Sequence, residues 1–173
     1  MQDREKREDG PHLKKVQNYI PGFRGYSHED DIRDGDRMLR MLMSQKINLA
    51  RKSLEESRQI LNEKNLFEQV DFIDFLLTAL KRLESEIGYA DSGLSWLASD
   101  SEMLGEELEQ LYEYDAQLLD NVAMILRVAE DLRMASAASD LHTISKNSID
   151  LRSRLSAFED IYRKRMLTLG RAH

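Results

Sequence analysis

Apolar residues recur along most of the chain at alternating steps of three and four, the spacing that places them on one face of an α-helix. A short stretch with this pattern covers residues 11–19, where Pro11 suits the first turn of a helix. Four long stretches follow, at about residues 27–63, 66–97, 101–135 and 139–169. Short connections make successive helices antiparallel. The sequence therefore predicts an all-α fold, an elongated antiparallel four-helix bundle in up-down-up-down order. The alternative is two helical hairpins exchanged within a dimer.

Local signals predict where two of these helices begin. Ser27, followed three residues later by Asp30, resembles a capping box, and Asn65 followed by Glu68 gives the same signal for the next helix. The stretch 66–97 also has aromatic residues beside its apolar stripe, so we expect it to be the most buried helix. These aromatic residues are Phe67, Phe72 and Phe75.

Residues 20–26, with the sequence IPGFRGY, form the one irregular and distinctive segment between the predicted helices. Pro21 ends the short helix, and the glycines allow turns that other residues resist. We expect this Pro/Gly loop to cap one end of a single bundle domain spanning residues 11–173, after a flexible segment at 1–10. Gly35 weakens the helix that follows. Either another segment approaches closely there or this glycine carries no information.

Asp115 occupies a core position in the most regular stretch, whose heptad seam is typical of coiled-coil packing. A buried carboxylate is costly without a partner. In an antiparallel bundle Asp115 lies at the same end as the loop and as Asp36. The candidate partners there are Arg24, Arg33, Arg37, Arg40 and the hydroxyls of Tyr26, Tyr89 and Tyr112. Two interpretations stay open: a polar lock that fixes loop position and helix register, or a small binding pocket beneath the loop.

Composition and motifs argue against most catalytic chemistry. The sequence has no cysteine, which excludes disulfides and thiolate sites and fits a cytoplasmic protein. None of the 4 histidines has a glutamate three residues earlier, so the di-metal site of ferritin-like bundles is not expected. The net charge of −7 disfavours binding to nucleic acid. We therefore expect no catalytic residue, no metal and no cofactor.

The loop and the residues after it resemble a family of uncharacterised prokaryotic helical-bundle proteins. The signature is an N-terminal IPG, an aromatic residue, any residue and GY, and here it is read at residues 20–26. An Arg/Asp-rich helix start follows at residues 31–40, and Gly88-Tyr89-Ala90 and residues 111–115 are similar to later signatures. The resemblance covers the first forty residues best. It implies a helical fold and no established activity.

These observations favour a non-enzymatic protein-interaction or scaffold protein, whose partner is another protein or a second copy in a homo-dimer. Phe23, Arg24 and Tyr26 are residue types enriched at binding hot spots. If the loop binds a partner, Phe23 and Arg24 should be exposed, whereas a structural plug would bury Phe23 and Tyr26. The alternative is a peripheral membrane-associated protein that uses its basic and apolar N-terminal segment. That segment comprises Lys14, Lys15, Val16, Tyr19, Ile20 and Phe23.

Overall fold

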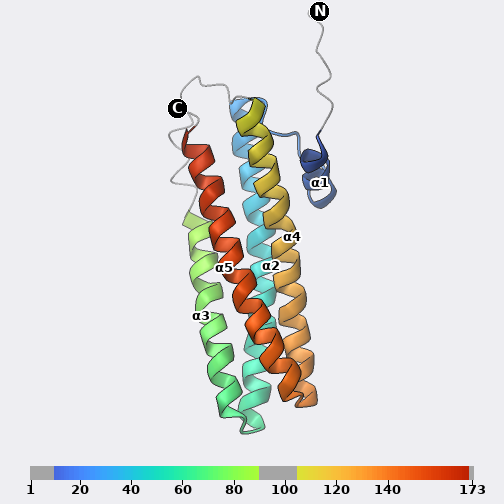
Figure 1. The fold of residues 1–173 in the computed structure, drawn as a ribbon, viewed down its shortest axis with the longest axis vertical. Helices are drawn as coiled ribbons and strands as arrows, with labels where there is room; N and C mark the ends of the chain where they lie inside the picture. The colour runs from blue at the N-terminus through green and yellow to red at the C-terminus, as the bar shows by residue number, and fades with distance from the viewer. Residues whose placement is uncertain (1–9, 90–104, 172–173) are drawn as a thin grey trace, which may run out of the picture.

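A computed structural model describes residues 10–89 and 105–171 and confirms the all-helical fold (Figure 1). The described helices are α1 (Pro11–Tyr19), α2 (Glu29–Glu63), α3 (Phe67–Tyr89), α4 (Gly105–Ala138) and α5 (Leu141–Arg171). Residues 1–9 of the flexible segment predicted at 1–10, and the predicted helical residues 90–97 and 101–104, lie outside the described residues. Within the described ranges, no helix is long and apolar enough to cross a membrane.

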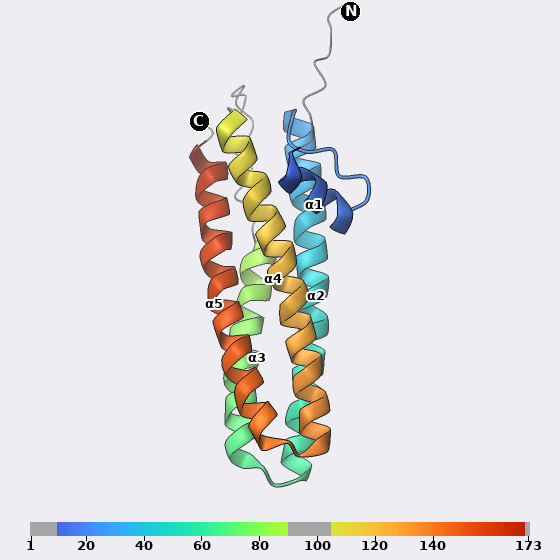
Figure 2. The same cartoon turned by 45° about the vertical axis from the view of Figure 1, so that its right-hand side comes forward.

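The four long helices pack as a bundle in which α2 and α4 are parallel neighbours (Figures 1 and 2). At one end of this pair, the ammonium group of Lys64 in the turn after α2 donates to the carbonyl of Ser136 in α4, at 3.1 Å. Helix α5 runs antiparallel to α4 and packs beside it, and α3 packs against α2 and α5. Helix α4 also packs against α1. Helices α3 and α4 do not pack against each other over the described residues.

The ends of α2 differ from the capping prediction. The residue preceding α2 is His28, and no side-chain hydrogen bond caps the helix, so the predicted capping box at Ser27 is wrong. Asn65 has a φ of 59° and therefore adopts the left-handed conformation that commonly ends a helix. The backbone N–H of Leu66 donates to the carbonyl of Leu61 at 2.9 Å. Asn65 thus closes α2, and α3 begins only after this turn.

Helix α3 is not the most buried helix, which corrects the prediction from its aromatic residues. Phe67, Phe72 and Phe75 are 60%, 48% and 53% exposed. Among the described residues, α3 packs only against α2 and α5, whereas α4 is covered by α1, α2 and α5. The aromatic residues broaden the apolar stripe of α3 beyond the width that its two neighbours cover.

Candidate functional site

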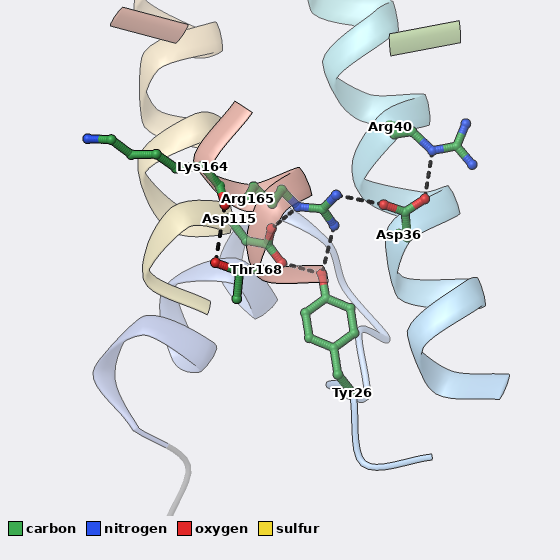
Figure 3. A network of polar contacts seen from close by, with 7 residues as sticks. All are labelled: Tyr26, Asp36, Arg40, Asp115, Lys164, Arg165 and Thr168. Carbon is green, nitrogen blue, oxygen red and sulfur yellow. Dashed lines mark hydrogen bonds and ion pairs between the residues drawn. The ribbon is translucent and has the colours of Figure 1, made fainter. Parts of the chain in front are cut away.

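Five polar side chains form a buried cluster at the end where α2 and α4 begin and α5 ends (Figure 3). This polar cluster consists of Tyr26, Asp36, Arg40, Asp115 and Arg165. The loop supplies Tyr26, α2 supplies Asp36 and Arg40, and α4 and α5 supply one residue each. None of the five is more than 7% exposed. The cluster therefore connects segments that are far apart in the sequence.

Arg165 lies at the centre of the polar cluster and has no exposed side-chain surface. Its Nε–H donates to Oδ1 of Asp115 at 2.6 Å, and Nη1 donates to Oδ1 of Asp36 at 2.7 Å. Its Nη2 donates to the hydroxyl oxygen of Tyr26 at 3.3 Å. One planar guanidinium thus joins α5 to α4, to α2 and to the loop. The adjacent Lys164 points away from the cluster (Figure 3).

The remaining hydrogen bonds occupy the second oxygen of each carboxylate. The hydroxyl of Tyr26 donates to Oδ2 of Asp115, and Nε of Arg40 donates to Oδ2 of Asp36 at 2.7 Å. Two carboxylates therefore face two guanidinium groups, and their formal charges balance. Burial of charge on this scale is tolerated only with such pairing and with the remaining oxygens hydrogen-bonded.

Electrostatics keep Tyr26 neutral and Arg165 charged. Burial raises the pKa of Tyr26 well above its ordinary value, and the negative charge of Asp115 raises it further. Burial also raises the pKa of Asp115, although the charge of Arg165 opposes this shift. Burial acts to lower the pKa of Arg165, but Asp115 and the other acceptors raise it well above its ordinary value. The neutral phenol is thus available as a hydrogen-bond donor to Asp115.

The loop packs into the bundle as a plug. Phe23 and Tyr26 are 3% and 2% exposed, and the Tyr26 and Tyr112 rings stack with centroids 5.3 Å apart. The backbone N–H of Tyr26 donates to the Tyr112 hydroxyl at 2.9 Å. A Cβ atom at Gly35 would lie 2.8 Å from ring carbons of both Phe23 and Tyr26. Of the two interpretations left open for Gly35, the structure therefore supports the close approach of another segment, and the two rings occupy the space that a side chain there would need.

Most of the predicted site residues meet at this end of the bundle. Phe23, Tyr26, Asp36, Tyr112 and Asp115 lie in contact with the plug or in the polar cluster. By contrast, Arg24 is exposed and its guanidinium lies 3.8 Å from Asp31 and 4.0 Å from Asp34. Arg33 is exposed on α2, outside the polar cluster, and the side chain of Tyr89 lies outside the described residues.

The principal partner of Asp115 is Arg165, which is not among the candidate partners predicted from the sequence. A usable signal was present in the spacing. The buried residues Phe158, Tyr162 and Leu169 leave a gap in their steps of three and four that position 165 fills. An arginine at a seam position on one helix and an aspartate at a seam position on another are candidates for a buried pair.

The apolar half of the predicted membrane anchor packs inside the protein. Val16, Ile20 and Phe23 are buried. Lys15 forms an ion pair with Asp120 of α4, and the Tyr19 hydroxyl donates to Oδ1 of Asp120 at 2.8 Å. Helix α1 therefore directs its apolar side chains towards α4, and these three residues are not on the surface of the folded chain.

The polar cluster has the properties of a structural lock. All four carboxylate oxygens of Asp36 and Asp115 accept hydrogen bonds from within the cluster, and the described residues contain no group of three or more side chains suited to hold a metal. Its hydrogen bonds join the loop to α2, α4 and α5 and fix the position of these helices relative to one another along the bundle axis. This arrangement fits the first of the two interpretations of Asp115.

A second feature is the outer surface shared by α3 and α5. Six of the ten exposed large apolar side chains in the described ranges lie on these two helices: Phe67, Phe72, Phe75, Leu141, Ile149 and Leu167. The guanidinium of Arg152 lies over the Phe75 ring, 4.9 Å from its centroid. A shallow groove of about 170 Å³ lies beside them and is lined by Phe75, Ala79, Arg152 and Leu155, among others. We call the surface formed by Phe72, Phe75, Ile149 and Arg152 the α3–α5 face.

Comparisons with known proteins provide no match from which a function could be inferred, so any proposal rests on the chemistry of the residues described above. The resemblance to a prokaryotic helical-bundle family at residues 20–40 stays a prediction. No protein-family model, curated protein or solved structure matches the chain.

Proposed function

We propose that the protein is a non-enzymatic interaction or scaffold protein of the cytoplasm, and that it binds its partner through the α3–α5 face. The up-down-up-down bundle supplies a rigid platform, and the loop capping one end holds three of its helices together. The observation that carries the proposal is the exposure of Phe72, Phe75 and Ile149, at 48%, 53% and 69%. Neighbouring exposed aromatic and branched side chains mark interaction surfaces on proteins in water.

The loop is the weaker candidate for binding. Phe23 and Tyr26, two of its three hot-spot residue types, are buried among the helices. A partner could reach them only by displacing the plug and breaking the hydrogen bonds of Tyr26. Only the Arg24 side chain is exposed, and carboxylates of α2 lie within reach of it. The α3–α5 face needs no such rearrangement.

A comparison of two surface variants tests this proposal. The face variant carries Phe72→Gln, Phe75→Gln and Ile149→Gln, which remove apolar surface and suit a helix. The control variant carries Leu49→Gln and Met134→Gln, at positions that are 41% and 55% exposed on α2 and α4. Both should melt close to the parent, because exposed positions contribute little to stability.

The measurement is quantitative affinity capture from the cell of origin with tagged parent, face variant and control variant. We expect the proteins enriched by the parent, including untagged copies of the chain itself, to be lost with the face variant and retained with the control. Equal recovery with the parent and the face variant would refute a role for the α3–α5 face.

A further inference from the structure

We infer that the occupant of the α3–α5 face is a second copy of this chain, docked about a two-fold axis that crosses the face between Phe72 and Phe75. This inference rests on the proposed function, because it names the partner of the same surface. A two-fold interface uses the same patch on both copies, so the patch must complement itself.

The register of α3 and α5 places the required groups at defined levels along the face. Arg152 lies over Phe75, and Arg82 of α3 pairs with Glu159 of α5, so in both contacts the α5 residue lies 77 positions after its α3 partner. The two helices therefore run in parallel at a constant offset. The same offset puts Ile149 level with Phe72. Three exposed apolar side chains thus lie at two neighbouring levels of the two packed helices.

The charges beside this patch are complementary under a two-fold rotation. Asp71 is exposed one turn before Phe75 on the same face of α3, and Arg152 lies level with Phe75 on α5. Neither Asp71 nor Arg152 forms an ion pair within the part of the chain that the structure describes. An axis between the levels of Phe72 and Phe75 brings Arg152 of one copy to the level of Asp71 of the other. Symmetry then repeats this pair on the opposite side of the axis.

The position of the axis sets the size of the interface. Helix α3 begins at Phe67, so an axis between Phe72 and Phe75 overlaps only the first turns of α3 in the two copies, about 20 Å of helix at 1.5 Å per residue. Such an interface is smaller than the about 800 Å² that a stable complex buries on each partner, so the expected dimer is a weak one. The groove beside Phe75, lined by apolar side chains together with the Arg82–Glu159 ion pair, adds a depression on this surface.

Charge reversal with rescue tests this arrangement by sedimentation equilibrium of the full chain. Arg152→Asp alone and Asp71→Arg alone each turn two attractive pairs into repulsive ones. We expect each to raise the dimer dissociation constant by about tenfold. The Asp71→Arg/Arg152→Asp variant restores opposite charges and should return the constant to within about threefold of the parent. Arg127→Asp, at an exposed α4 position away from the face, changes the net charge by the same amount as Arg152→Asp and should leave dimerisation unchanged.

Three results would overturn the inference: a parent that stays monomeric up to hundreds of micromolar, a dimer that survives the face variant, or a double reversal that does not restore association. The capture experiment separates this failure from that of the proposed function. A monomeric parent whose captured proteins are other chains, and are lost with the face variant, would refute self-association while supporting the interaction surface. A monomeric parent whose captured proteins do not depend on the face would refute both.

Discussion

Replacing Arg165 by methionine tests whether the polar cluster depends on its central charge. Methionine keeps an unbranched side chain of similar reach but donates no hydrogen bond. The substitution removes the donors to Asp115, Asp36 and Tyr26, which lie 2.6, 2.7 and 3.3 Å from the guanidinium nitrogens. Among the described residues, Asp115 would then keep only the Tyr26 hydroxyl as a hydrogen-bond donor, and the two buried carboxylates would face the single charge of Arg40.

The expected cost is about 3–5 kcal/mol, the range found when one partner of a buried ion pair is removed. A protein of 173 residues loses about 2–4 °C of melting temperature for each kcal/mol, so we expect a fall of about 6–20 °C. Arg163→Met is the matched control on the same helix. Its side chain is 71% exposed and its guanidinium lies 3.6 Å from Asp160, so its loss should cost no more than about 0.5 kcal/mol.

The cost should also depend on pH with a defined sign. Burial raises the pKa of Asp115 even in the presence of Arg165, and without that charge the folded-state pKa rises further. A group with a raised folded-state pKa contributes stability that is present below its unfolded pKa and is lost as the pH rises through the folded pKa. Arg165→Met should therefore be less damaging at pH 5 than at pH 8.

Urea denaturation of the parent and both arginine variants at these two pH values provides the measurement. The variant Arg165→Met/Asp115→Leu should be more stable than Arg165→Met alone, because the unpaired carboxylate is then absent. A destabilisation below about 1 kcal/mol that is equal at both pH values would refute the reasoning, since it would mean that the carboxylates do not depend on Arg165.

Two further substitutions test the plug and its phenol. Gly35→Ala should destabilise the protein, because its Cβ would lie 2.8 Å from the Phe23 and Tyr26 rings, whereas Gly88→Ala, with open space around it, should stabilise the protein by about 0.5–1 kcal/mol. Thermal melts that place both alanine variants above the parent would contradict the close packing at Gly35. Tyr26→Phe should remove one late-ionising phenol from a spectrophotometric titration, because burial raises the pKa of Tyr26 well above 10.0. Because its folded-state pKa is raised, this phenol contributes stability below its unfolded pKa and loses that contribution as the pH rises through the folded-state pKa. Above pH 10 the free energy of unfolding should therefore fall less steeply in Tyr26→Phe than in the parent. An unchanged titration curve would show that Tyr26 is accessible to solvent.

The periodicity of apolar residues was enough to predict the helices, because burial of one face is a local property of each segment. It also identified Asp115 and Asp36 as members of a polar cluster beneath the loop. It could not identify Arg165, which is 50 residues from Asp115 and 129 residues from Asp36. A helical pattern reveals which side is buried and says nothing about which helix lies opposite. The same limit explains why α3 was wrongly predicted to be the most buried helix: its aromatic residues mark an apolar side, but the pattern does not show how many helices cover that side.

The polar cluster also bears on why the bundle adopts one register. Apolar seams with steps of three and four repeat, so a helix displaced by a turn, about 5.4 Å, can still present an apolar face to its neighbours. Arg165 does not tolerate such a shift, because its hydrogen bonds to Asp36 and Asp115 require α2, α4 and α5 at one relative height. A displaced α5 would leave a buried guanidinium facing two apolar seams, at a cost of several kcal/mol. The Tyr26 hydroxyl adds the loop to this requirement, so the plug seats fully only when the three helices are correctly aligned.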